Sequence, residues 1–81
     1  MLTIATKTKL KPEAVIKQAV DFFGPKGYKL VVVEQTSSGA AFEGGGGGVG
    51  ITVTPHETST EVELISREWD YQVKEFIGKI S

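Results

Sequence analysis

Cysteine is absent from the 81-residue sequence, and histidine occurs once, at position 56. The missing thiols exclude a disulfide framework, a cysteine-based zinc site and a thiol nucleophile, and one histidine excludes a multi-histidine metal centre. We therefore expect neither a bound metal nor a cofactor. Because small secreted domains commonly depend on disulfides, a cysteine-free chain of this length favours a reducing compartment, which we expect to be the cytoplasm.

Long apolar runs and clustered basic residues are also missing. The longest strongly apolar run is residues 30–33, and the N-terminus lacks the basic segment and long apolar stretch of a signal peptide. We expect no association with membranes. Arginine occurs once, at position 67, and the net charge is -1, whereas nucleic-acid-binding domains carry clusters of lysine and arginine. Nucleic acid is therefore not the expected partner.

The length and composition are those of one small globular domain, spanning residues 1–81. Hydrophobic residues make up 40% and charged residues 23% of the chain, which excludes a disordered composition. Charge is divided unevenly. Residues 1–29 carry six lysines and two acidic residues, whereas residues 30–81 carry three basic and eight acidic residues. We expect these complementary parts to pair within one fold.

Hydrophobic periodicity predicts seven elements. Alternation predicts strands, while Pro12 followed by Glu13 is typical of a helix start and Gly24-Pro25 of a helix end. Trp69 opens an apolar stripe at helical spacing near the C-terminus, which predicts a second helix with its N-cap at Ser66. The predicted elements are, in order, a strand at 2–8, a helix at 12–23, strands at 28–35, 40–43, 49–54 and 60–65, and the helix that follows Ser66.

This order, β-α-β-β-β-β-α, predicts an α+β fold with a curved five-stranded antiparallel sheet and two helices on one face. The first and fifth strands are expected to be neighbours, because outward Lys7 and Lys9 would then face Glu61 and Glu63 as opposite-charge pairs. In element order the chain resembles the helix-grip folds of the pollen-allergen and START-like lipid-binding families, and a single repeat of the TATA-binding protein. The resemblance implies a curved antiparallel sheet packed against a long C-terminal helix.

Two groups of polar residues have spacings that could support chemistry. His56 stands near Glu57 and Ser59 in a predicted turn, where a Ser-His-acid arrangement would lack the burial and orientation that catalysis needs. Glu61 and Glu63 share one strand face and could bind a cation or act as an acid–base pair, although pairing with lysines explains them as well. We predict no catalytic residue and expect that the protein is not an enzyme.

The run of five glycines admits three interpretations. Glycine lets backbone N–H groups converge on an anion, but the Gly-Lys-Ser/Thr helix start of a phosphate loop is absent and Val49 begins a strand. The run also fits a flexible hairpin tip, or a stretch where the backbone passes close to a helix side chain. We expect it to be the most mobile interior segment, because residues without Cβ lose the most backbone entropy on ordering.

Trp69 is predicted to be mostly buried against the inward side chains of the sheet. The alternative is a small-ligand groove between the sheet and the C-terminal helix. The residues that would line this groove are Trp69, Tyr71, Arg67, Gly44, Gly45, Gly46, Gly47 and Gly48.

The apolar run at residues 30–33 points to a partner surface. If Leu30 and Val32 face the helices, their neighbours face the other side of the sheet, where a monomer has water. Gly50 and other small or apolar residues are expected beside them. The predicted partner-facing residues are Val31, Val33, Ala41, Thr52 and Ile65. Because contiguous apolar patches mark partner surfaces, we predict a non-enzymatic interaction module, homodimeric through this face or bound to another protein, with the small-ligand groove as the alternative.

Overall fold

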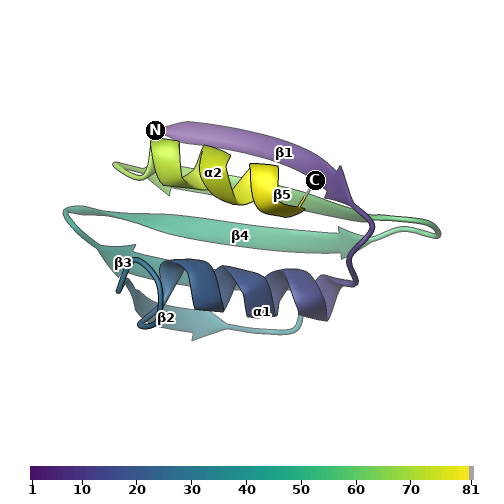
Figure 1. The fold of residues 1–81 in the computed structure, drawn as a ribbon, viewed down its shortest axis with the longest axis horizontal. Coiled ribbons are helices and arrows are strands. Elements are labelled where there is room, and N and C mark those ends of the chain that lie inside the picture. Colours follow the sequence, from purple (N-terminus) through teal and green to yellow (C-terminus); the bar gives the residue numbers. More distant parts are fainter. Residues whose placement is uncertain (81) are drawn as a thin grey trace.

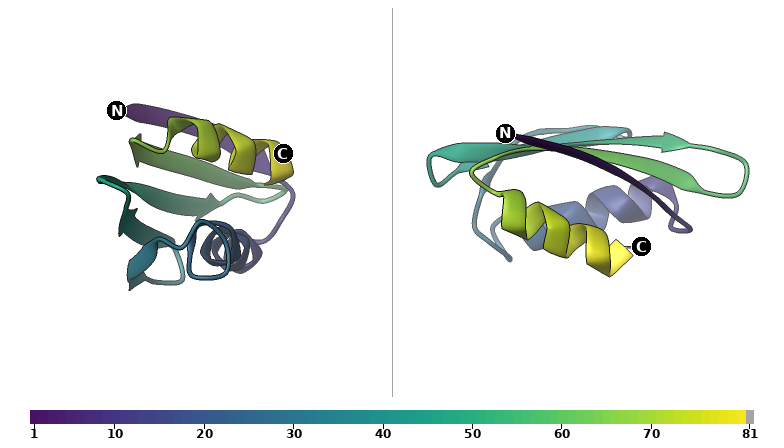
Figure 2. Two further views of the ribbon diagram at one scale, coloured as in Figure 1. Left: turned by 60° about the vertical axis from the view of Figure 1, so that its left-hand side comes forward. Right: turned by 90° about the horizontal axis from the view of Figure 1, so that it is seen from above.

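Residues 1–80, the part of the chain that this computed structural model describes, form one five-stranded antiparallel sheet and two helices (Figure 1). Both helices lie on the same face of the sheet (Figure 2). Neither helix is long and apolar enough to cross a membrane. The elements are β1 (Leu2–Thr8), α1 (Pro12–Phe23), β2 (Val31–Gln35), β3 (Gly39–Gly44), β4 (Gly47–Pro55), β5 (Thr60–Arg67) and α2 (Asp70–Ile80). The predicted α+β class and element order are confirmed.

The strand order in the sheet is β1-β5-β4-β3-β2, with antiparallel pairing throughout. The prediction that the first and fifth strands are neighbours is confirmed. Lys7 lies opposite Glu61, as expected, but Glu63 lies opposite Ala5. Lys9 does not face Glu63 because β1 ends before it and the chain turns toward α1. The predicted charge pairing is therefore correct at one position and wrong at the other.

The core lies between the sheet and the two helices. Aromatic rings meet at its centre, where the ring centroid of Phe23 lies 5.6 Å from that of Phe42 and 5.4 Å from that of Phe76. The residues of α1 buried against the sheet are Val15, Ile16, Ala19 and Phe23. The buried residues of β5 are Thr60, Val62, Leu64 and Ser66. This alternation in β5 leaves its remaining side chains on the opposite face.

The second strand begins later than predicted, at Val31 rather than at residue 28. The chain leaves α1 through a turn in which the N–H of Tyr28 donates to the carbonyl of Phe22 at 3.0 Å. Lys29 then adopts a positive φ of 67°, which interrupts an extended strand. The β-branched composition of this segment did not reveal that turn, because the turn depends on hydrogen bonds back to the helix.

The last helix also begins later than predicted. Ser66 lies within β5 and is not the N-cap, because Glu68 has a positive φ of 68° that separates strand from helix. The carbonyl of Trp69 accepts the first helical hydrogen bond, from the N–H of Val73 at 2.9 Å. Ser66 nevertheless stabilises the helix start, since its buried Oγ accepts from the N–H of Trp69 at 3.1 Å and donates to Asp70 at 2.9 Å.

Candidate functional site

The face of the sheet opposite the helices is uncovered in residues 1–80 (Figure 2). Val31, Val33 and Ile65 are 63%, 51% and 45% exposed on the strands, although hydrophobic side chains of this size are commonly buried. This face, which we call the open face, is the candidate functional site.

A row of small and apolar residues crosses the middle of the open face. The register aligns Ala41 with Gly50, Gly50 with Ile65, and Ile65 with Thr3. Val33 joins this row through a β-bulge, because the pairing passes from Val32–Phe42 to Glu34–Ala41 and leaves Val33 as an extra residue. The row therefore runs across all five strands.

The centre of the open face is a shallow depression. Two hollows of about 310 and 320 Å³ both include Ala41, Gly50 and Ile65, and so form one continuous trough. A Cβ atom added at Gly50 would meet no atom within 4 Å. Ala41 and Gly50 form the floor of this trough, while Val33 and Ile65 rise on its two sides. Such a surface fits a partner that presents a ridge of side chains.

Charged side chains close both ends of the trough. Glu43, Gly48 and Arg67 lie side by side on β3, β4 and β5. The two charged side chains lean over the glycine, since a Cβ atom there would lie 3.5 Å from an Arg67 guanidinium nitrogen and 3.6 Å from Cγ of Glu43. Glu34 and Glu63 line the other end. The trough thus has an apolar middle and a charged rim, as protein interfaces commonly do.

The structure places all the predicted partner-facing residues on this face: Val31, Val33, Ala41, Thr52 and Ile65. Sequence reasoning did not include Glu34, because a β-bulge that places consecutive side chains beside Ala41 leaves no mark in the alternation pattern. It also assigned Arg67 to a different site. The pairing of Gly48 with Arg67 puts that guanidinium on the open face, which only the register of β4 and β5 determines.

The glycine run forms the hairpin between β3 and β4, with Gly47 and Gly48 inside β4. Trp69 packs against it. The indole Nε1 donates to the carbonyl of Gly44 at 2.9 Å, and a Cβ atom at Gly45 would lie only 2.8 Å from Cζ2 of the indole. Of the three interpretations of the run, the geometry corresponds to two: Gly45 and Gly46 form a hairpin tip, and the backbone at Gly45 passes close to the side chain of Trp69. Its mobility stays a prediction.

The residues predicted to line a ligand groove lie in different surroundings. Trp69 is mostly buried, as predicted, and packs against both the core and the hairpin. Tyr71 is 73% exposed on α2, and Arg67 lies on the open face. The space between the sheet and α2 holds the buried side chains Val73 and Phe76. A groove is present instead between α1 and α2, with a volume of about 470 Å³.

Among the described residues, His56 contacts a carboxylate other than the one considered in the Ser-His-acid arrangement. Nε2 of His56 lies 3.5 Å from Oε1 of Glu61, and both side chains are about half exposed. Ser59 contributes its backbone carbonyl to the turn, accepting from the N–H of His56. No group of three potential metal ligands occurs within residues 1–80.

No family model, curated protein or solved structure matches this chain. The fold and the site place the chain in a structural class. This class is that of small α+β proteins with two helices on one face of an antiparallel sheet and an uncovered trough on the other face. The resemblance to helix-grip proteins and to a TATA-binding repeat stays a prediction.

Proposed function

We propose that this protein is a small non-enzymatic interaction module of the cytoplasm that forms a homodimer through the open face. The observation that supports the proposal is the apolar trough between Val33 and Ile65, which neither helix covers. Burying a few hundred Å² of apolar surface contributes several kcal/mol at ~25 cal/mol per Å², before the cost of association is subtracted. We choose a second copy as the partner because two-fold dimers, in which both copies use the same surface, are the commonest closed assemblies.

The size of the face matches a small dimer interface. The molecule extends 37 × 20 × 16 Å, so a rectangle of 37 × 20 Å, about 740 Å², encloses the open face in projection; this upper limit is close to the ~800 Å² per partner of a standard interface. A dimer of this size must use the charged rim as well as the apolar middle. The arrangement of the rim therefore restricts how two copies can be oriented.

A two-fold axis parallel to β4 and passing above Gly50 satisfies both shape and charge. The strands of the two sheets then run in nearly the same direction, as in aligned sheet packing. Ile65 of one copy lies over Ala41 of the second copy, so that a large side chain meets a small one. Glu43 and Arg67 flank Gly48 on either side, and the two-fold axis exchanges these two positions. Arg67 of one copy therefore lies opposite Glu43 of the second copy.

Sedimentation tests the dimer. We expect the wild type to sediment as a dimer at tens of micromolar, and a Val33→Lys, Ile65→Lys double variant to sediment as a folded monomer, because each copy would bring two ammonium groups into the interface. Tyr71→Lys is the matched control, since this exposed residue lies on α2 and its variant should remain dimeric. A wild type that stays monomeric at several hundred micromolar would refute homodimerisation, and a dimeric double variant would refute the open face as the interface.

Cross-linking tests the axis, and the absence of native cysteine makes it site-specific. Packed sheets lie about 10 Å apart, so a Gly50→Cys variant should be cross-linked into a covalent dimer by a bis-maleimide of about 8–10 Å reach. Thr3→Cys should not be cross-linked, because β1 lies two strands from β4 and the equivalent residues would be displaced by about 20 Å. Efficient cross-linking of both variants would contradict this axis and indicate one running across the strands.

A further inference from the structure

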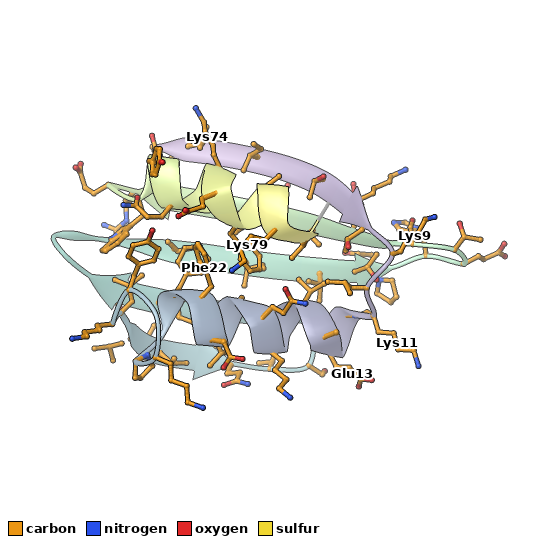
Figure 3. All side chains as sticks on the ribbon, in the orientation of Figure 1. Lys9, Lys11, Glu13, Phe22, Lys74 and Lys79 are labelled. Carbon is orange, nitrogen blue, oxygen red and sulfur yellow. The ribbon has the colours of Figure 1, made fainter. Side chains whose placement is uncertain are left out.

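The groove between α1 and α2 lies on the helix side of the molecule, away from the open face. Its volume of about 470 Å³ is large enough for a small organic molecule or an extended side chain. Figure 3 shows Phe22 of α1 and Lys79 of α2 close to one another in the gap between these two helices.

Aromatic rings form the apolar part of this groove. The ring centroid of Phe22 lies 5.3 Å from that of Tyr28 and 5.4 Å from that of Phe76. Phe76 is buried, whereas the other two rings retain exposed surface in the groove. Nζ of Lys79 lies 5.2 Å from the centroid of Phe22, within the range of a cation–π contact. One alkylammonium group is thus already seated in the groove.

Carboxylates add negative charge at the rim of the groove. Asp21 and Glu75 line it from opposite helices. The hydroxyl of Tyr28 donates to Oε1 of Glu75 at 2.7 Å, and this hydrogen bond, together with desolvation and the nearby negative charge, raises the pKa of Tyr28 above its ordinary value. Because that proton stays on the phenol at neutral pH, the carboxylate of Glu75 stays oriented toward the aromatic rings.

We propose that this groove is a binding site for a primary alkylammonium group, carried by a polyamine or by a lysine side chain of a peptide. The ligand would place its ammonium over the ring of Phe22 and its methylene chain along the aromatic rings, in a groove whose lining includes the carboxylates of Asp21 and Glu75. The ammonium group of Lys79 occupies this position over Phe22 in the free protein, and the ligand displaces it. Two carboxylates against one lysine give the groove the net negative charge that favours exchange of one cation for another.

A titration followed by NMR tests this site, with 1,5-diaminopentane as the probe. We expect resonance shifts at Phe22, Tyr28 and Glu75 at millimolar concentrations of the diamine, and no comparable shifts with the neutral isostere 1,5-pentanediol. Lys79→Gln should bind the diamine several-fold more tightly, because the competing ammonium is removed. The matched control is Lys74→Gln, which removes the same charge from α2 at a side chain that points away from the groove (Figure 3).

Several results would overturn the proposal. The first is the absence of diamine-induced resonance shifts at these residues in Lys79→Gln, and the second is that the diol causes shifts as large as those of the diamine. The third is an equal gain in affinity for the diamine in Lys79→Gln and Lys74→Gln, which would indicate a general charge effect only. A Glu75→Gln variant should weaken binding in the Lys79→Gln background, and unchanged binding would count against the site. Tighter binding of spermidine than of Nα-acetyl-lysine amide, whose side-chain ammonium is free, would identify polyamines as the source of the bound ammonium group. The reverse order would identify peptides as the source.

Discussion

Replacement of Phe76 by alanine is expected to remove at least a quarter of the free energy of unfolding of this protein. The side chain is 1% exposed, and its ring centroid lies 5.4 Å from those of Phe22 and Phe23. A buried Phe→Ala substitution costs about 3–5 kcal/mol, through lost burial and the cavity that remains. A domain of 81 residues has a free energy of unfolding of about 4–12 kcal/mol, at ~0.05–0.15 kcal/mol per residue.

Denaturant unfolding measures this loss. The transition midpoint should fall strongly in Phe76→Ala, with partial unfolding in the absence of denaturant if the wild type lies at the lower end of that range. Tyr71→Ala is the control on the same helix: its side chain is 73% exposed, and the expected change is within about 0.5 kcal/mol. A cost below about 1 kcal/mol for Phe76→Ala would mean that α2 does not pack on the sheet as described.

Two neighbouring glycines of the β3–β4 hairpin should differ sharply in their tolerance of alanine. Gly45 and Gly46 both have positive φ, at 58° and 80°, so each Gly→Ala substitution carries a backbone cost of about 1–2 kcal/mol. Only Gly45 lies against Trp69, where a Cβ atom would stand 2.8 Å from the indole, whereas a Cβ atom at Gly46 would meet nothing within 4 Å. Displacing the indole also lengthens its hydrogen bond to Gly44.

We therefore expect Gly45→Ala to cost about 1–3 kcal/mol more than Gly46→Ala, the usual range for overpacking. The fluorescence maximum of Trp69 should shift to the red in Gly45→Ala only, because its displaced indole gains contact with water. Since Trp69 is the one tryptophan of the chain, the signal reports this contact alone. Equal stability and equal spectra of the two variants would show that the indole does not restrain the hairpin in solution.

Local patterns in the sequence determined the type and order of the elements. Pro12 and the Gly24-Pro25 pair bound α1 where they were expected to, because proline and glycine restrict or extend backbone angles whatever their surroundings. Alternation placed Val31 and Val33 on the face away from the helices, since side chains of a strand point to opposite sides of the sheet. The open face could therefore be predicted without coordinates.

Contacts between distant segments decided the details of the site. The bulge that brings Glu34 beside Ala41, and the register that puts Arg67 across Gly48 from Glu43, follow from strand pairing, which no single segment encodes. The positive φ of Glu68, which keeps Ser66 in β5, likewise accompanies the packing of Trp69 on the glycine hairpin. The groove between α1 and α2 exists only because the two helices meet on the sheet, and thus depends on tertiary packing alone.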